Sequence, residues 1–153
     1  LQPASICSYC ARMKRGKLYT CCRREGYNVL VLGQHLDDLG ESFVMSAFNN
    51  GLLRTMKANY TVSDGDLRVI RPMVAVREVM TRDFARTNKL PIIEDNCPAC
   101  FEAPKERHRV KRMLAAQEHH IPFLFPNLLN AMHALMDIKS VDGNTGTELD
   151  EKD

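Results

Sequence analysis

The chain has 153 residues and a mass of 17.4 kDa, with 44% hydrophobic and 26% charged residues, which is typical of one folded domain. This composition argues against disorder of the whole chain, and the absence of an apolar run near the roughly 20 residues that span a bilayer excludes a membrane-embedded protein. The net charge of +2 conceals an asymmetry, because residues 137–153 carry −4 and residues 1–136 carry +6. The positive excess lies in two runs, 12–24 and 105–112, which are either phosphate-binding surfaces or solvated helix faces.

The first half of the chain predicts helices that alternate with short strands. A helix is expected over residues 8–25, with Gly26 at its end. The continuous apolar run 29–32 is typical of a buried parallel strand. Asp37 or Asp38 is expected to cap the next helix, which ends at residues 49–51.

The second half continues the alternation. Residues 57–66 form a loop or irregular hairpin, and Val69 and Ile70 form a short strand. The later elements are predicted as follows: an amphipathic helix over 77–88 that buries Val79 and Phe84 and exposes Arg82 and Arg86, a third strand over 91–94, a helix from Pro104 to His120 that buries Val110 and Leu114, a helix over 127–136, and a disordered acidic tail over 138–153. The pattern predicts an α/β fold.

Six cysteines in a chain without a secretory signal favour metal or thiol chemistry over a disulfide framework. Cys7 with Cys10 and Cys97 with Cys100 form two CxxC pairs, whereas the adjacent Cys21 and Cys22 are expected to be packing residues. The two CxxC pairs are too far apart in sequence for a local zinc module. They can meet only through the fold, as a zinc centre or an iron-sulfur cluster, or they are unrelated thiols.

A second group of polar residues directly follows the strand at 29–32. Gly33, His35, Asp37 and Asp38 lie where ligands bind in open α/β sheets, and two carboxylates beside a helix start suit a magnesium-nucleotide site. Asp37 and Asp38 point in different directions, so only one is expected to face a ligand. Helix capping alone is an equally good explanation of this segment.

Four ordered motifs together resemble the tRNA 2-thiocytidine synthetase family, which comprises tRNA-thiolating members of the PP-loop, or adenine nucleotide alpha-hydrolase-like, ATPases. The motifs are CSYCARMKRGKLY at 7–19, LGQHLDD at 32–38, IRPM at 70–73 and CPAC at 97–100. The resemblance covers residues 7–136 and implies a Rossmann-like parallel sheet with flanking helices. It also implies a partial PP-loop ATPase domain over residues 1–137, followed by the acidic tail.

The resemblance further implies ATP- and magnesium-dependent adenylation of a tRNA base, cytidine in this family, followed by sulfur insertion from a 4Fe-4S cluster held by three cysteines. Cys7 and Cys10 match the first two ligands, and the third is Cys97 or Cys100, with Cys97 favoured. Lys14 and Asp38 match the lysine and aspartate used near the nucleotide and the reacting base. The implied partners are a tRNA, a cysteine desulfurase or another sulfur donor, and a second copy of the chain in a cytoplasmic homodimer. The implied tRNA phosphate contacts are Arg12, Arg15, Lys17, Lys105, Arg109 and Arg112.

One family feature is missing from the sequence. The Ser-Gly-Gly-x-Asp-Ser motif, whose backbone amides bind the pyrophosphate of ATP, does not occur anywhere in the chain. We therefore expect poor ATP binding by this chain alone, and we interpret it as the C-terminal part of a longer enzyme or as a degenerate relative.

Two other interpretations stay open at this stage. A zinc-stabilised RNA-binding module without catalysis would account for the basic runs and for the missing phosphate loop. A PP-loop enzyme that acts on another acceptor, as in tRNA lysidine or small-molecule amide synthesis, would leave the paired CxxC elements without a role.

Overall fold

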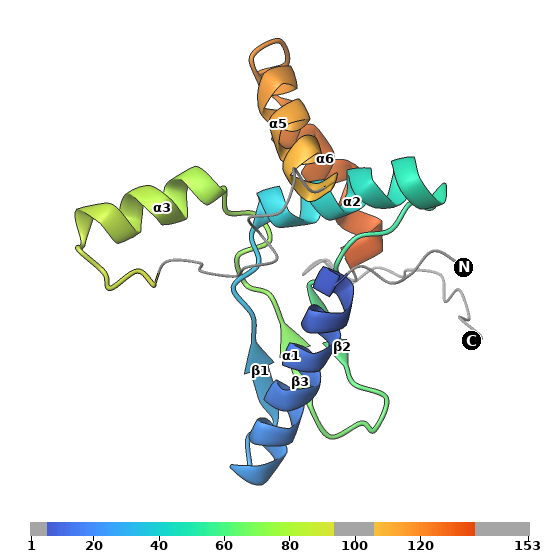
Figure 1. Ribbon diagram of the computed structural model, residues 1–153, viewed down its shortest axis with the longest axis vertical. Coiled ribbons are helices and arrows are strands. Elements are labelled where there is room, and N and C mark those ends of the chain that lie inside the picture. Colours follow the sequence, from blue (N-terminus) through green and yellow to red (C-terminus); the bar gives the residue numbers. More distant parts are fainter. Residues whose placement is uncertain (1–5, 94–105, 137–153) are drawn as a thin grey trace, which may run out of the picture.

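The computed structural model describes residues 6–93 and 106–136 (Figure 1). In chain order its elements are α1 (Ile6–Arg24), β1 (Val29–Val31), α2 (Leu36–Asn50), β2 (Asn59–Thr61), β3 (Arg68–Ile70), α3 (Glu78–Thr87), α5 (Glu106–Glu118), α6 (Leu124–Met132) and the 3₁₀ helix η1 (His133–Met136). Helices and short strands alternate, so the predicted α/β class is confirmed. The predicted tail, the CPAC segment and Lys105 lie outside the described residues.

A small mixed sheet has the strand order β1-β3-β2. β1 pairs with β3 in parallel, with Val29 opposite Arg68 and Val31 opposite Ile70. β2 pairs with β3 antiparallel, and the turn between them contains Gly65 at φ 76°. The sheet is therefore not wholly parallel, because the segment expected as a loop or hairpin contributes a strand of its own.

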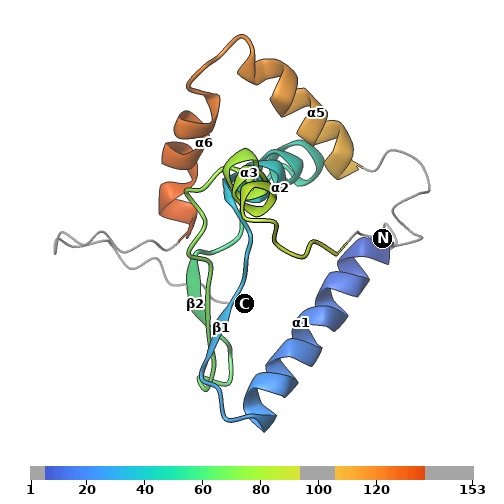
Figure 2. The same cartoon turned by 90° about the vertical axis from the view of Figure 1, so that its left-hand side faces the viewer.

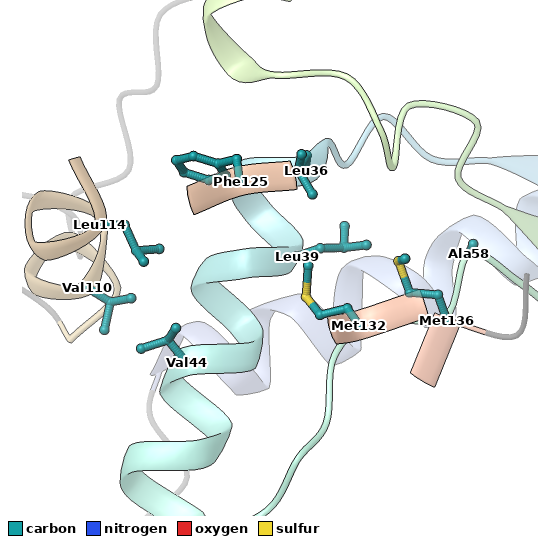
Figure 3. Packing of buried hydrophobic residues seen from close by; sticks show 9 residues of the cluster. All are labelled: Leu36, Leu39, Val44, Ala58, Val110, Leu114, Phe125, Met132 and Met136. Atoms are coloured by element: carbon teal, nitrogen blue, oxygen red, sulfur yellow. The ribbon is translucent and has the colours of Figure 1, made fainter. Parts of the chain in front are cut away.

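The main core lies around α2, which packs against α5 and α6 (Figure 3). Leu39 of α2 and Met132 of α6 are fully buried, and Val110 and Leu114 of α5 are buried as predicted. Val110 and Leu114 are four residues apart, which places them on one face of α5. The core fixes the position of the segment that leads from β1 into α2.

Helix α1 lies beside the sheet and is attached mainly through its C-terminal half. Gly26, at φ 74°, follows the helix end and turns the chain into β1. Arg23 forms ion pairs with Asp66 (2.6 Å) and Asp64 (2.7 Å) of the β2-β3 turn, which raise the pKa of Arg23. Figure 2 shows that α1 and the strands approach each other at this end and diverge toward the N-terminus of α1.

Several burial predictions were wrong. Val29 and Val31 are 41% and 58% exposed, because the described residues do not fully cover the face of the sheet from which both side chains project. Val79 and Phe84 are exposed because α3 projects away from the other helices (Figure 1), and residues 91–93, where a third strand was expected, are exposed and unpaired. Among the residues that the structure describes, no strand lies beside this segment to supply the hydrogen bonds that a strand needs.

The expectation that Cys21 and Cys22 are both packing residues is confirmed for only one of them. Cys22 is buried, whereas the Cys21 side chain is exposed. Within residues 6–93 and 106–136, no helix combines the length and apolar content needed to cross a lipid bilayer.

Candidate functional site

The carboxyl ends of the two parallel strands carry polar residues that meet in space. Gln34 follows β1 and Arg71 directly follows β3, and the Arg71 Nε atom donates to Gln34 Oε1 at 3.0 Å. Arg71 Nη1 also donates to the carbonyl of Lys57, and the Arg71 side chain is buried. Ligands bind at this edge in open α/β sheets.

The segment after β1 forms a tight helix start. His35 is the N-cap of α2; its Nδ1 atom accepts from the Asp38 amide at 3.4 Å, and its own amide donates to Asp38 Oδ2 at 3.2 Å. Gly33 lies beside Met73. The prediction that Asp37 or Asp38 is the cap residue was therefore wrong, although Asp38 completes the capping box from the third helical position.

Asp37 stabilises a different helix from the one it belongs to. Its Oδ2 atom accepts the Glu78 amide at 2.7 Å, at the start of α3, and its carboxylate pairs with Arg77 at 3.2 Å. Arg77 also donates to Glu118 of α5, and its guanidinium carbon lies 3.4 Å from the ring centroid of Phe125. The Glu118 and Asp37 carboxylates raise the pKa of Arg77. Asp37 thus ties α2, α3 and α5 together.

Asp38 is also paired with an arginine that sequence reasoning missed. Arg107 Nη2 donates to Asp38 Oδ1 at 2.9 Å, and Arg107 Nε donates to Glu41 Oε2 at 2.7 Å. The described residues contain no group of three or more His, Cys, Asp or Glu side chains that could hold a metal ion. Because arginines already neutralise both aspartates, this arrangement does not by itself fit a magnesium ion. A ligand role for either aspartate stays a prediction that requires its arginine to move.

The predicted sulfur chemistry falls on the first half of α1. Cys7 lies in its first turn, and Cys10, three residues later, is an exposed free thiol. Lys14, one helical turn after Cys10, is exposed as well. A solvent-facing thiol in a CxxC pair is a suitable donor for a zinc ion or an iron-sulfur cluster. Cys97 and Cys100 lie outside the described residues, so the full ligand set stays a prediction.

A basic cleft opens on the other side of α1. It has a volume of about 630 Å³ and lies between α1 and residues 55–63, next to Arg71. From the helix it is lined by Arg12, Arg15, Gly16 and Tyr19; from the opposite wall it is lined by Thr55, Met56, Lys57, Tyr60, Val62, Ser63 and Arg71. We call this the α1 cleft.

The α1 cleft separates the predicted residues of α1 into two faces. Arg12 and Arg15 line it, whereas Cys10 and Lys14 each lie two residues from Arg12, a rotation of about 200° around the helix. Lys17 is exposed and does not line the cleft. Arg12 and Arg15 therefore point to one side of α1, and the Cys10 thiol points to the other.

The second predicted basic run lies on a different helix from the first. Arg109 and Arg112 are exposed on α5, which packs on α2 and α6, whereas α1 lies against the sheet (Figure 1). Arg109 pairs with Glu106, which lowers the pKa of the Glu106 carboxyl. Neither Arg109 nor Arg112 is among the residues that line the α1 cleft.

Tyr19 and Arg71 belong to the motifs at 7–19 and 70–73, but sequence reasoning assigned neither a role of its own, and it gave no indication of Tyr60 or Arg107 as site residues. Arg71 could have been found from its place, since a charged residue directly after a parallel strand lies at the ligand-binding edge. Tyr19 lies four residues after Arg15 and so shares its helix face. Tyr60 and Arg107 have no such local signal, because their positions depend on contacts distant in sequence.

Comparison with solved structures supports this fold. The U34-tRNA thiolase NcsA from Methanococcus maripaludis, solved with its [4Fe-4S] cluster, matches 90% of this chain and 46% of its own chain, with a TM-score of 0.68 and 18% identity. At that identity the likeness shows the fold alone, which is a Rossmann-like fold of the α/β class.

Comparison of sequences adds closer relatives. The tRNA-cytidine(32) 2-sulfurtransferases of Geobacter sulfurreducens and Geobacter metallireducens are each 40% identical to this chain over 129 residues, or 84% of its length. The chain spans about half the length of these relatives, since the matches cover 50% of each. The sequence model of the PP-loop domain family matches residues 6–118. The chain therefore belongs to the PP-loop domain family.

Proposed function

We propose that the chain supplies the cluster-binding and RNA-binding half of an ATP-dependent tRNA sulfurtransferase that thiolates a cytidine. The observation that carries the proposal is the 40% identity to two tRNA-cytidine(32) 2-sulfurtransferases over 129 residues. The exposed Cys10 thiol supports it, because it places a thiolate donor on the same helix as Arg12 and Arg15, which line the basic α1 cleft from the opposite face.

The proposed cofactors are ATP, magnesium and a 4Fe-4S cluster. When bound, ATP activates the base oxygen as a leaving group and the cluster supplies the sulfur that replaces it. Cys7 and Cys10, with Cys97 or Cys100, are the proposed cluster ligands. Three protein thiolates would leave one iron of the cluster without a protein ligand, and sulfur would bind there. We propose that magnesium accompanies the phosphates of ATP, because the described aspartates are engaged by arginines.

The remaining roles belong to charged side chains. The Lys14 ammonium neutralises phosphate charge near the cluster, and Asp38 lies near the reacting base, where Arg107 fixes the carboxylate. The tRNA is held by charge, through contacts to its phosphates that carry no sequence information. The side chains proposed for these contacts are Arg12, Arg15, Lys17, Lys105, Arg109 and Arg112. The proposed partners are the tRNA, a cysteine desulfurase or another sulfur donor, and a second copy of the chain, all in the cytoplasm.

The test is anaerobic reconstitution of the purified chain with iron and sulfide. We expect a broad visible absorption that Cys10→Ala abolishes and that Cys21→Ala retains, because Cys21 is an exposed thiol on the same helix outside the CxxC pair. A colourless protein that holds one zinc ion on four cysteines would contradict the proposal and favour a zinc-stabilised RNA-binding module.

A further inference from the structure

The α1 cleft is built like a binding site for an anion. Arg12 and Arg15 project from one face of α1, and Arg71 and Lys57 lie on the opposite wall. None of the described residues that line it is acidic. Its volume of about 630 Å³ falls within the usual range for ligand pockets.

Arg71 is the strongest indication of a ligand. It is only 5% exposed, and within residues 6–93 and 106–136 its hydrogen-bond partners are two neutral oxygens, Gln34 Oε1 and the Lys57 carbonyl. A buried charge is normally paired with an opposite charge, because desolvation of an unpaired ion is costly. A phosphate in the cleft would supply the negative charge that these neutral partners do not.

Two tyrosines add aromatic surface to the same cleft. The hydroxyls of Tyr19 and Tyr60 form a 2.8 Å hydrogen bond that links α1 to β2. The Arg71 guanidinium carbon lies 5.7 Å from the Tyr60 ring centroid. Positive side chains that follow a backbone, combined with aromatic rings on which bases stack, are typical of single-stranded nucleic-acid sites.

We infer that the α1 cleft binds a single-stranded RNA segment, with phosphates on Arg12, Arg15 and Arg71 and a base against the tyrosine pair. This inference rests on the proposed function for its identification of the RNA as tRNA. Cys10 lies on the opposite face of α1, across a helix about 10 Å in diameter. The cleft therefore holds nucleotides that flank the modified base and positions that base, which itself lies outside the cleft.

The test measures binding of a fluorescein-labelled single-stranded RNA heptamer to the whole 153-residue chain by fluorescence anisotropy over a range of salt concentrations. Each phosphate contact contributes about 0.7 to the slope of log affinity against log salt for single strands. Loss of two contacts in the double variant Arg12→Gln, Arg15→Gln should lower that slope by about 1.4 and weaken binding about 25-fold at 0.1 M salt.

The matched control is the double variant Arg82→Gln, Arg86→Gln, which removes the same charge from exposed positions on α3. We expect it to keep the wild-type slope. Equal losses in the two double variants, or no loss in the Arg12 and Arg15 variant, would overturn the inference. Binding of inorganic phosphate to the cleft without any binding of the RNA would also overturn it, because that result describes a simple anion site.

A direct readout does not depend on variants. RNA that carries 4-thiouridine, irradiated on the wild-type chain, should crosslink to peptides that contain Tyr19 or Tyr60, and crosslinks confined to α3 or α5 would refute the site. The Arg12 and Arg15 variant should also retain the iron-sulfur absorption. If the Arg12 and Arg15 variant reconstitutes the cluster and still binds RNA normally, only the inference about the α1 cleft is refuted. If the wild-type chain binds RNA in the cleft but takes up no cluster, only the thiolation proposal is refuted.

Discussion

Replacement of Arg77 by methionine tests whether Asp37 is a structural residue or a metal ligand. Arg77 joins the Asp37 carboxylate, the Glu118 carboxylate and the Phe125 ring, so its loss affects α2, α3, α5 and α6 together. Methionine retains most of the aliphatic volume and can still contact the aromatic ring. Arg77→Met therefore removes the donors with little change in packing.

The expected loss can be worked out from burial. The Asp37 side chain is only 12% exposed, so its charge-assisted bond contributes about 1.5–3 kcal/mol. The Glu118 side chain is 35% exposed, which limits that pair to about 0.2–1 kcal/mol. The stacking of the cation on Phe125 adds about 0.5–1 kcal/mol, which the thioether contact partly replaces. We expect Arg77→Met to lower the free energy of unfolding by about 3 kcal/mol.

The assay is urea unfolding followed by circular dichroism, in a double-mutant cycle with Asp37→Asn. We expect a coupling energy between the two positions of about 2 kcal/mol, and a change within about 0.5 kcal/mol for the control Arg82→Met, whose pair with Asp83 is exposed. Additive effects, or an Arg77→Met change no larger than that control, would refute the ion-pair account. An unfolding midpoint that rises with added magnesium only when Asp37 is present would instead assign Asp37 as a magnesium ligand.

Two further predictions concern the core and the contact between α1 and the sheet. Leu39 is fully buried, so Leu39→Ala should lower the free energy of unfolding by about 2–5 kcal/mol, while Leu53→Ala, at a position 66% exposed, should change it by less than about 0.5 kcal/mol in the same urea assay. Burial and the hydrogen bond to Tyr60 raise the pKa of Tyr19 above its ordinary value of 10.0, so its contribution to stability is complete below that pH and is lost as the pH rises through the folded-state value. Unfolding measured from about pH 8 to pH 11 should show this alkaline loss in wild type and in Tyr27→Phe but not in Tyr19→Phe, and an identical loss in all three would exclude Tyr19 as its source.

Local sequence patterns predicted most of the elements correctly. Gly26 and Gly51 both adopt the positive φ expected where a helix ends, and Val110 and Leu114 are buried on the face that their spacing predicts. These features depend on residues within one or two helical turns. Exposure was predicted less well, because the exposed fraction of Val31 or Phe84 depends on which other segments lie beside β1 and α3.

The sequence by itself determined the family resemblance, the CxxC pair at the start of α1 and the polar segment after β1, because each is a short motif within one element. Only the tertiary structure decided that Asp37 caps α3 and pairs with Arg77, and that Arg107 forms an ion pair with Asp38. It also decided that Arg71 lines the same cleft as Arg12 and Arg15. Arg77 and Arg107 follow their aspartates by 40 and 69 residues, so no local spacing rule connects them. The physical reason is that a side chain's partner is set by which helices and strands the core brings together, and that information is distributed over the whole chain.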